Sequence, residues 1–333
     1  MADRNRRIVL AAVPVGMPRE EDFRMEEVAV PVCAANGLLV RTKWVSVDPY
    51  LRGRISGVRS YVAPISVGAV MESGAVGEVV ASQDPAFQRG DIVSGFWGWQ
   101  EFDAVEAAKV QRVDPREAPV STALGILGMP GMTAYFGLTE VCAPKAGETV
   151  VVSGAAGAVG SAVGQIAKIL GCRAVGMAGT VAKVNHVKSL GFDDALNYRT
   201  DKPYKDVLAR MCPKGIDCYF DNVGGEFTDA VLGLMNVRGR VAICGQISQY
   251  NDRSLDVGPR PFTPMLVKQL RVEGFLVSRW AGRFGEGREQ MAGWLKQGRL
   301  RYEETVYEGL ESAPRAFIGL FLGENTGKAL VSV

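Results

Sequence analysis

The sequence predicts an α/β protein that combines a doubly wound parallel sheet with a second, β-rich domain. Three observations support this fold class. The first 120 residues hold short apolar runs separated by Gly, Pro and Asp, which is typical of strands and turns. From about residue 148, strand-like and helix-like segments alternate, and strand-like segments return after residue 298. Parallel strands need crossovers of this length, so the alternating part predicts a parallel sheet with helices packed on it.

Length and composition fit two globular domains. The 333 residues exceed what one compact core usually holds, and we expect one domain from residues 1–122, completed by 299–333, and another from 123–298. The 38 basic and 36 acidic residues nearly cancel, so neither nucleic acid nor a membrane is expected as a partner. Residues 118–139 are uncharged but contain Pro and Gly, which favours a buried hinge between the domains over a membrane helix.

The cysteines and the single histidine argue against a metal site. No two of the six cysteines have C-x-x-C spacing, and His186 is the only histidine. Protein zinc sites usually group three or four Cys, His, Asp or Glu ligands. We therefore expect no metal, and we interpret the cysteines as reduced thiols of a cytoplasmic protein.

The segments of the alternating part follow one another in a regular order. Short apolar runs predict strands, and the apolar periodicity between them predicts helices. The expected strands span 150–152, 174–177, 195–198, 216–220 and 241–244, and the expected helices span 158–170, 184–190, 204–211 and 226–235. Strands at 302–306 and 329–333 then flank a short helix at 314–322, and we expect this tail to rejoin the first domain.

A glycine-rich turn follows the first strand of the alternating part. Residues 153–160 read Ser-Gly-Ala-Ala-Gly-Ala-Val-Gly directly before an expected helix, where a dinucleotide site places its glycines. Gly157 would let the backbone approach a pyrophosphate, and Gly160 would let the helix pack on the strand. The N-terminus of the helix offers N–H groups and a positive dipole to phosphates. The alternative is a glycine-rich turn without a ligand.

The second strand indicates which dinucleotide is used. NAD sites place an acidic residue about 20 residues past the glycines, where it binds the ribose 2′-hydroxyl. Residues 177–183 contain no carboxylate, and Lys183 could pair with a 2′-phosphate. Such a contact is worth roughly 1.5–3 kcal/mol and predicts NADPH, unless Lys183 is only a solvated lysine at a helix start. After the fourth strand, Asn222 could bond the ribose or nicotinamide, or only cap a turn.

Tyr198 and Lys202 have the Tyr-x-x-x-Lys spacing of short-chain dehydrogenases. In that class the pair lies on one face of a helix. Here Tyr198 ends an expected strand and turn-forming residues follow it. The glycine motif also begins near residue 154 and not near the N-terminus, so we reject this interpretation.

Six short stretches spread over the chain resemble one known family. They span 47–53, 128–138, 155–160, 218–225, 243–245 and 323–328, and the first contains Asp48-Pro49-Tyr50. These stretches are similar to the prostaglandin reductases, zinc-independent medium-chain dehydrogenases/reductases that include leukotriene 12-hydroxydehydrogenases, alkenal double-bond reductases and curcumin reductases. The resemblance implies a GroES-like β-domain with a Rossmann domain, and a homodimer. It is weaker at 56–69 and 252–263, where substrate-covering loops would lie, so the individual substrate is not predicted.

The resemblance also implies which residues contact NADPH. The residues that it places at the cofactor are Gly157, Ala158, Val159, Gly160, Lys183, Tyr198, Asn222, the segment from Cys244 and Gly245 through Ser248 to Tyr250, the segment from Phe275 to Val277, and Asn325.

The implied reaction reduces the carbon–carbon double bond of an α,β-unsaturated ketone or aldehyde. Hydride reaches the β-carbon, and negative charge develops on the carbonyl oxygen, where a hydroxyl donor can stabilise it. The α-carbon then takes a proton from a tyrosine or from water. Tyr50, after the rigid Asp48–Pro49 turn, and Tyr250, in the loop after the fifth strand, are the candidate hydroxyls. Each could instead be a tyrosine packed at a domain junction.

Two alternative functions remain open, namely an NADPH quinone oxidoreductase and an NADPH-binding protein without catalytic activity. Trp97 and Trp99 are each expected either in the core or in an apolar substrate cleft. Arg52 and Arg54 fit a surface or domain-interface role better than a contact with a substrate carboxylate.

Overall fold

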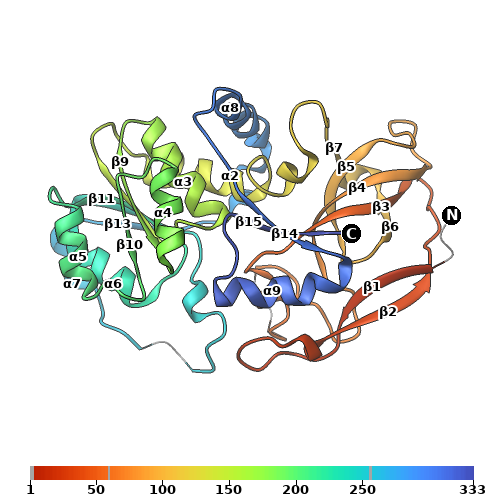
Figure 1. The fold of residues 1–333 in the computed structure, drawn as a ribbon, viewed down its shortest axis with the longest axis horizontal. Helices are drawn as coiled ribbons and strands as arrows, with labels where there is room; N and C mark the ends of the chain where they lie inside the picture. The colour runs from red at the N-terminus through yellow and green to blue at the C-terminus, as the bar shows by residue number, and fades with distance from the viewer. Residues whose placement is uncertain (1–3, 59–60, 255–256) are drawn as a thin grey trace. The chain divides into compact units, whose positions relative to one another are not determined.

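The computed structural model describes residues 4–58, 61–254 and 257–333 and divides into two compact units. Unit 1 comprises Met1–Gly125 together with Glu304–Val333, and unit 2 comprises Ile126–Glu303. The boundaries expected from the sequence, 122/123 and 298/299, lie a few residues from these. Unit 1 therefore takes its elements from both ends of the chain, coloured red to yellow and blue in Figure 1.

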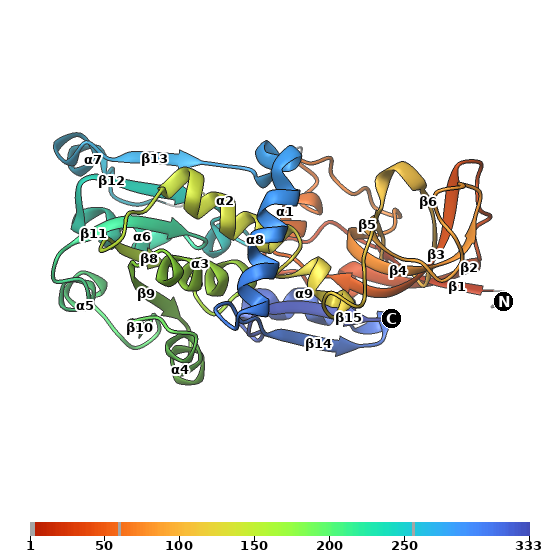
Figure 2. The same cartoon turned by 90° about the horizontal axis from the view of Figure 1, so that it is seen from above.

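Unit 2 is built on a six-stranded parallel sheet with short, apolar strands. In the order visible in Figure 2, the strands are β10 (Asp194–Asn197), β9 (Arg173–Ala178), β8 (Thr149–Val152), β11 (Ile216–Asp221), β12 (Met235–Ile243) and β13 (Arg271–Gly274). All pairs of neighbouring strands are parallel. Counted along the chain from β8, this is the doubly wound order, and its switch point lies between β8 and β11. The predicted parallel sheet is confirmed.

Helices cover both faces of this sheet. Val150 and Val152 of β8 pack into one core with α3, whereas Val151 packs into the other with α5 and α6, as the two-residue period of a strand requires. The helices of unit 2 are α2 (Met129–Phe136), α3 (Ala158–Ile169), α4 (Val181–Ser189), α5 (Tyr204–Met211), α6 (Gly225–Leu234), α7 (Phe262–Lys268) and α8 (Phe284–Lys296), with shorter turns η4 (Gly137–Cys142), η5 (Ile247–Gln249) and η6 (Val277–Arg283). The four predicted helices are confirmed.

Unit 1 is β-rich. The strands β1 (Arg4–Leu10) and β2 (Phe23–Ala29) form a two-stranded ribbon. A larger sheet has the strand order β14 (Glu304–Glu308), β15 (Lys328–Ser332), β3 (Gly37–Ser46), β4 (Glu72–Ser82), β5 (Ile92–Gly98) and β7 (Gln111–Arg112). In addition, β6 (Phe102–Glu106) pairs with β3. The C-terminal strand β15 pairs antiparallel with β3. The predicted return of the chain end to the first domain is therefore confirmed. Its helical segments are α1 (Leu51–Arg54), α9 (Ala313–Leu322), η1 (Glu20–Asp22), η2 (Ala107–Lys109), η3 (Val120–Leu124) and η7 (Leu310–Ser312).

Trp97 and Trp99 are core residues of unit 1. Both side chains are buried. The indole N–H of Trp97 donates to the Thr42 hydroxyl at 3.1 Å, and that of Trp99 donates to the Ser73 hydroxyl at 2.8 Å. A buried indole needs such a partner, so the sheet satisfies both rings internally. Of the two roles expected for them, the structure supports the core role.

Arg52 and Arg54 are also buried within unit 1, so of the surface and domain-interface roles expected for them, the surface role is wrong. The Arg52 guanidinium donates to the backbone carbonyls of Pro14 and Gly16 at 3.3 and 3.0 Å. Arg54 donates to the backbone carbonyl of Glu72 at 3.2 Å and forms an ion pair with its carboxylate at 3.0 Å. Backbone carbonyl groups take the place of water around both guanidinium groups. The order of charged residues in the sequence does not reveal such contacts.

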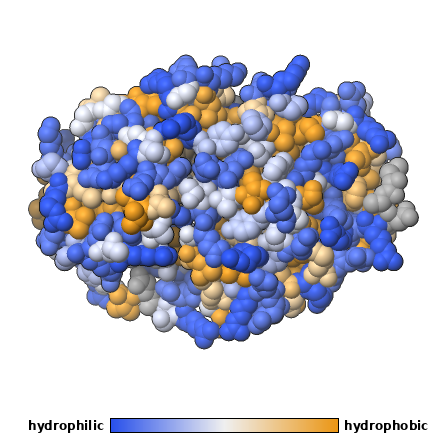
Figure 3. All heavy atoms as spheres, in the orientation of Figure 1, coloured by the Kyte–Doolittle hydropathy of each residue, from blue (hydrophilic) through white to orange (hydrophobic). Residues whose placement is uncertain are grey.

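The uncharged segment 118–139 forms short helical pieces and not one long helix, and most of α2 is buried. Within the described ranges, none of the helices is both long enough and apolar enough to span a membrane. On the face shown in Figure 3, hydrophilic atoms predominate and hydrophobic ones are scattered among them, which is ordinary for a globular surface.

Candidate functional site

The glycine-rich turn lies at the switch point of the six-stranded sheet. β8 ends at Val152 and α3 begins at Ala158. Gly157 is the N-cap residue of α3, with an extended backbone, and no side chain caps this end of the helix. The first N–H groups of a helix have no acceptor within it. Because the helix dipole adds positive potential at the same end, the turn suits a phosphate group.

Two of the glycines of this turn, Gly157 and Gly160, meet different surroundings. A Cβ atom on Gly160 would lie 2.3 Å from the carbonyl oxygen of Gly154, so only glycine lets α3 approach the end of β8 this closely. A Cβ atom on Gly157 would meet nothing nearer than 3.4 Å. Packing therefore requires Gly160, whereas the space around Gly157 remains for a ligand.

The carboxylate of Asp221, at the end of β11, is fully buried and organises the loop that follows it. Its Oδ1 accepts hydrogen bonds from the Tyr219 hydroxyl at 2.8 Å and from the backbone N–H groups of Val223 and Gly224, both at 2.9 Å. Its Oδ2 accepts one from the Thr228 hydroxyl at 2.7 Å. Burial, and then the nearby Asp221 charge, raises the pKa of Tyr219 well above its usual value, so this phenol remains a donor.

Ser153 joins this loop to the glycine-rich turn. Its hydroxyl donates to Asp221 Oδ1 at 2.9 Å and accepts from the backbone N–H of Asn222 at 2.8 Å. The side-chain amide of Asn222 donates to the Ser153 carbonyl oxygen at 2.7 Å. The sequence indicated Asn222 but not its partners. The Asn222 Oδ1 and the second N–H of its amide are then the groups with which this side chain would meet a ligand.

The loop after β12 is tied to the same place. The backbone N–H groups of Cys244 and Gly245 donate to the Asp221 carbonyl oxygen at 2.8 and 3.1 Å. The Ser248 hydroxyl donates to the Val223 carbonyl oxygen at 2.6 Å. Burial, and then the Asp221 charge, raises the pKa of the Cys244 thiol to about 12, so it is not a nucleophile at neutral pH. The loops after β8, β11 and β12 thus form one connected surface.

Tyr250 follows η5 in this loop. Its hydroxyl accepts from the backbone N–H of Gln246 at 3.4 Å, and a Cβ atom on Gly245 would lie 3.0 Å from the same hydroxyl. Burial raises the pKa of Tyr250, so its hydroxyl keeps a proton that it can donate.

Lys183 and Arg199 bring two positive charges close together after β9 and β10. Lys183 lies in the first turn of α4, and its backbone N–H donates to the capping Thr180 hydroxyl at 3.2 Å. Burial, and then the Arg199 charge, lowers the pKa of Lys183. The Arg199 guanidinium lies 5.7 Å from the ring centre of Tyr198, and that ring packs over Gly179. Since like charges repel, a bound dianion would stabilise this cluster.

The sequence did not single out Arg199, although it directly follows Tyr198. Its closeness to Lys183 arises because β10 pairs with β9 in parallel, which brings the ends of both strands together. Tyr198 lies in the turn after β10, outside any helix, and this confirms the rejection of the short-chain dehydrogenase pattern.

Phe275 and Val277 follow β13, the edge strand. The Phe275 ring packs edge-on against Phe220 and Trp280, with ring centres 6.0 and 5.7 Å apart. Val277 packs against the same core. The backbone of this segment is therefore better placed than its side chains to meet a cofactor.

In unit 1, Tyr50 directly precedes α1 and is partly buried. The Leu51 N–H donates to the Asp48 carbonyl oxygen at 3.2 Å, which closes the turn. Burial, and then the charge of Asp48, raises the pKa of Tyr50 above its usual value. The Tyr50 phenol therefore stays protonated. Asn325 lies in the turn before β15, where its side-chain amide donates to the Gly327 carbonyl oxygen at 2.8 Å.

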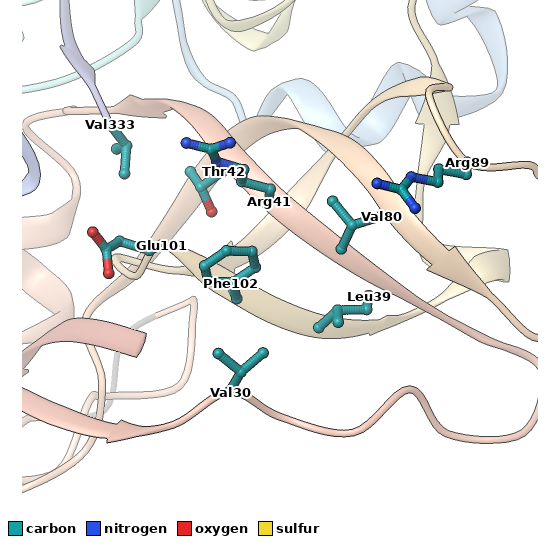
Figure 4. A pocket seen from close by; sticks show the side chains of 9 residues that line it. All are labelled: Val30, Leu39, Arg41, Thr42, Val80, Arg89, Glu101, Phe102 and Val333. Atoms are coloured by element: carbon teal, nitrogen blue, oxygen red, sulfur yellow. The ribbon is translucent and has the colours of Figure 1, made fainter. Parts of the chain in front are cut away.

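Unit 1 also contains a hollow of about 400 Å³ on its sheet (Figure 4). None of the predicted site residues lines it, so we assign it no part in the candidate site. Its lining consists of Val30, Leu39, Arg41, Thr42, Val80, Arg89, Glu101, Phe102 and Val333.

Comparison with known proteins places this geometry in a family. One family model, described as the N-terminal domain of oxidoreductase, matches residues 6–113, and another, described as zinc-binding dehydrogenase, matches residues 158–295. The NADPH-dependent curcumin reductase of Escherichia coli is 44% identical over 336 residues, which cover 99% of this chain and 97% of that protein. The chain belongs to the zinc-independent medium-chain dehydrogenase/reductase family. Among the residues that the structure describes, no group of three or more His, Cys, Asp or Glu is placed to hold a metal ion.

Other family members match along almost the whole chain. The NADP⁺-dependent 2-alkenal reductase of Nicotiana tabacum is 42% identical over 335 residues, covering 99% of this chain and 97% of that protein. The crystal structure of CurA in complex with NADPH, from Vibrio vulnificus, has a TM-score of 0.94 at 41% identity and covers 98% of this chain and 99% of that one. The Rossmann-like parallel sheet and the separate β-rich unit are therefore shared by this family.

Proposed function

We propose that this protein is an NADPH-dependent reductase of the carbon–carbon double bond of α,β-unsaturated ketones and aldehydes. The observation that carries the proposal is the Tyr50 phenol, partly buried in the Asp48–Pro49–Tyr50 turn and kept protonated. A protonated hydroxyl is what a developing enolate oxygen requires. The curcumin reductase and the 2-alkenal reductase described above support the same substrate class.

The residues of unit 2 fit NADPH. The N-terminus of α3, with Gly157, Ala158, Val159 and Gly160, would hold the pyrophosphate. Lys183 and Arg199 would hold the 2′-phosphate, because a dianion offsets both causes of the lowered pKa of Lys183, namely its burial and then the Arg199 charge.

The remaining contacts proposed for NADPH come from loops and turns, and several of them use backbone groups. They are Tyr198 beside the 2′-phosphate, the Asn222 Oδ1, the backbone of Cys244, Gly245 and Ser248, the backbone of Phe275 and Val277, and the turn that carries Asn325.

In this mechanism the tyrosines act as hydrogen-bond donors. NADPH supplies, when bound, the hydride that the β-carbon receives. The Tyr50 hydroxyl donates to the substrate carbonyl oxygen, and this bond strengthens as negative charge develops there. The raised pKa of Tyr50 makes it a reluctant proton donor, so we assign the proton on the α-carbon to water. Tyr250, which also keeps its proton, is the second candidate donor.

An acceptor panel tests the proposal. NADPH consumption is followed by nicotinamide absorbance with enals, enones, quinones and simple ketones, and is repeated with NADH. We expect turnover of enones and enals with NADPH, and a product that is saturated at the former double bond. Turnover of quinones alone would identify a quinone oxidoreductase. Tight binding of NADPH without turnover of any acceptor would identify a non-catalytic binding protein.

Substitution of Tyr50 tests the mechanism. We expect Tyr50→Phe to lower kcat about a hundred- to a thousandfold with a smaller change in KM, because the contact is made mainly in the transition state. Tyr307→Phe, a partly buried tyrosine of β14, is the matched control and is expected to retain kcat. An unchanged kcat in Tyr50→Phe would reject the role of this hydroxyl.

A further inference from the structure

Lys328, the first residue of β15, carries a buried ammonium group whose contacts all lie inside unit 1. Only 4% of its side chain is exposed. Its Nζ donates to the carbonyl oxygen of Val47 at 2.7 Å and to Asp48 Oδ1 at 3.0 Å. Burial lowers the pKa of Lys328, and the Asp48 carboxylate opposes that effect. This lysine belongs to the stretch 323–328, in which the proposed mechanism uses only Asn325.

The partners of Lys328 form the turn that carries Tyr50. The Asp48 carboxylate is 9% exposed, and its Oδ2 accepts a short hydrogen bond from the Ser46 hydroxyl. The Val47 N–H donates to the carbonyl oxygen of Ala329, the next residue of β15, at 3.3 Å. β15 therefore holds Val47 through both its N–H and its C=O, and holds the side chain of Asp48 as well.

Stability alone does not explain why this ion pair is buried. Removing two charges from water costs several kcal/mol per ion, and apolar residues of similar volume often stabilise a core at least as well. A buried pair with directed hydrogen bonds does, however, fix the orientation of the segments that it joins. Here the joined segments are β15 and the Asp48–Pro49–Tyr50 turn.

We propose that Lys328 is a positioning residue for Tyr50, holding the turn so that the phenol meets the substrate carbonyl oxygen at a fixed angle. Lys328 touches neither substrate nor cofactor in this role and acts through Val47 and Asp48. The inference rests on the proposed function, because it requires Tyr50 to take part in turnover. Misplacement of a reacting group by about 1 Å is enough to lower a rate about a hundredfold.

A double-mutant cycle tests the inference on the full-length protein. Wild type, Lys328→Met, Tyr50→Phe and the double variant are compared for kcat and KM with an enone at saturating NADPH, and for thermal unfolding. We expect Lys328→Met to lower kcat about tenfold with little change in KM, and to have almost no further effect when Tyr50 is already Phe. Lys109→Met, which removes an exposed lysine paired with Glu106, is the control and is expected to retain kcat.

Each outcome of the cycle has a distinct meaning. An equal loss of kcat in both backgrounds, or no loss in either, overturns the inference and leaves the proposed function standing. If Tyr50→Phe alone retains full kcat, the role of Tyr50 fails and the inference fails with it. If the wild type turns over no enone, the proposed function itself is wrong.

A further variant with two substitutions covers the case in which Lys328→Met does not fold, since that change leaves Asp48 buried without its partner. Asp48→Asn combined with Lys328→Met removes both charges. We expect the combined variant to fold and to keep a lowered kcat, because Val47 still lacks its ammonium donor. Wild-type kcat in the combined variant would overturn the inference.

Discussion

The hydroxyl of Ser153 donates a hydrogen bond to the buried carboxylate of Asp221 across a distance of 2.9 Å. This bond joins the ends of β8 and β11, the two strands between which the sheet reverses its order. Dinucleotides bind at such a switch point. The relative position of the two loops of the proposed cofactor site thus depends on one carboxylate that no ligand needs to touch.

Asp221→Ala is expected to destabilise the fold. The change removes the acceptor for Ser153, Tyr219 and Thr228 and for two backbone N–H groups, and buried unsatisfied donors cost about 1–3 kcal/mol each. We expect a loss of at least about 3 kcal/mol in the free energy of unfolding, measured by denaturant titration. Asp221→Asn, which keeps an acceptor oxygen of the same shape, should lose much less. Equal stability of Asp221→Ala and wild type would contradict the assigned role.

Two alanine substitutions in the glycine-rich turn should have opposite signatures. Gly160→Ala places Cβ against the Gly154 carbonyl oxygen, so we expect a lower unfolding temperature. Gly157→Ala adds a methyl group where the protein leaves space and at a backbone conformation that alanine adopts, so stability should be retained while NADPH binds more weakly. Scanning calorimetry and a fluorescence titration with NADPH separate the two effects. The role assigned to Gly157 is wrong if Gly157→Ala lowers the unfolding temperature and retains the affinity for NADPH.

Lys183 and Arg199 should set the preference between NADPH and NADH. Each charge-assisted contact with a 2′-phosphate contributes roughly 1.5–3 kcal/mol. We expect Lys183→Ala and Arg199→Ala each to lower kcat/KM for NADPH about ten- to a hundredfold and to leave kcat/KM for NADH nearly unchanged. Lys188→Ala on the same helix, paired with Asp194, is the control. An equal loss of kcat/KM with NADPH and with NADH would show that these residues stabilise the fold and do not recognise the 2′-phosphate.

The dependence of the rate on pH should show that Tyr50 stays protonated. Its raised pKa means that the phenol keeps its proton while free tyrosines, with a pKa near 10, ionise. The ratio of kcat between wild type and Tyr50→Phe should therefore stay constant from about pH 6 to about pH 10. The stability that comes from keeping Tyr50 neutral is complete below the pKa of the unfolded chain and declines as pH rises above it. A ratio that approaches one near pH 10 would show that Tyr50 ionises there.

The cysteines should differ in their reactivity towards a thiol reagent. Burial raises the pKa of Cys172 and Cys212 to about 11 and that of Cys244 to about 12. Only the thiolate reacts, so these thiols should be labelled slowly near neutral pH. Cys33, which is partly exposed, should be labelled first, and Cys33→Ser should lose that fast phase. Rapid labelling of Cys244 in the native protein would contradict its raised pKa.

The parts of the fold that follow a simple apolar pattern could be predicted from the sequence. The strand β8 and helix α3 are examples, because each buries a regular set of apolar side chains. The strand β12 was predicted only from residue 241, yet it begins at Met235. The part of β12 before residue 241 contains Asn236, Arg238 and Arg240, and these polar side chains interrupt the apolar pattern by which a strand is recognised. The edge strand β13 carries Arg271 and Glu273 and escaped prediction for the same reason.

Within the candidate site, some residues could be predicted from the sequence and others could not. Gly157, Lys183 and Asn222 could be predicted because each lies at a fixed distance from a recognisable strand. The roles of Asp221 and Arg199 could not, because Ser153, which links Asp221 to the glycine-rich turn, lies 68 residues earlier and Lys183, beside Arg199, lies in α4 after the neighbouring strand β9. Such contacts depend on the order of strands in the sheet, which local periodicity does not contain.

The discontinuous make-up of unit 1 has a consequence for how the protein is made. β15 lies between β14 and β3 in the sheet, although it is translated more than two hundred residues after β3. At about 5–20 residues per second, the ribosome needs on the order of 10–40 s to travel from Gly125 to this strand. Throughout that interval unit 2 can emerge and fold as one continuous stretch, while residues 44–46 of β3 lack the strand that will pair with them. The nascent chain thus carries an open sheet edge at these residues until β15 has been made and can pair with β3.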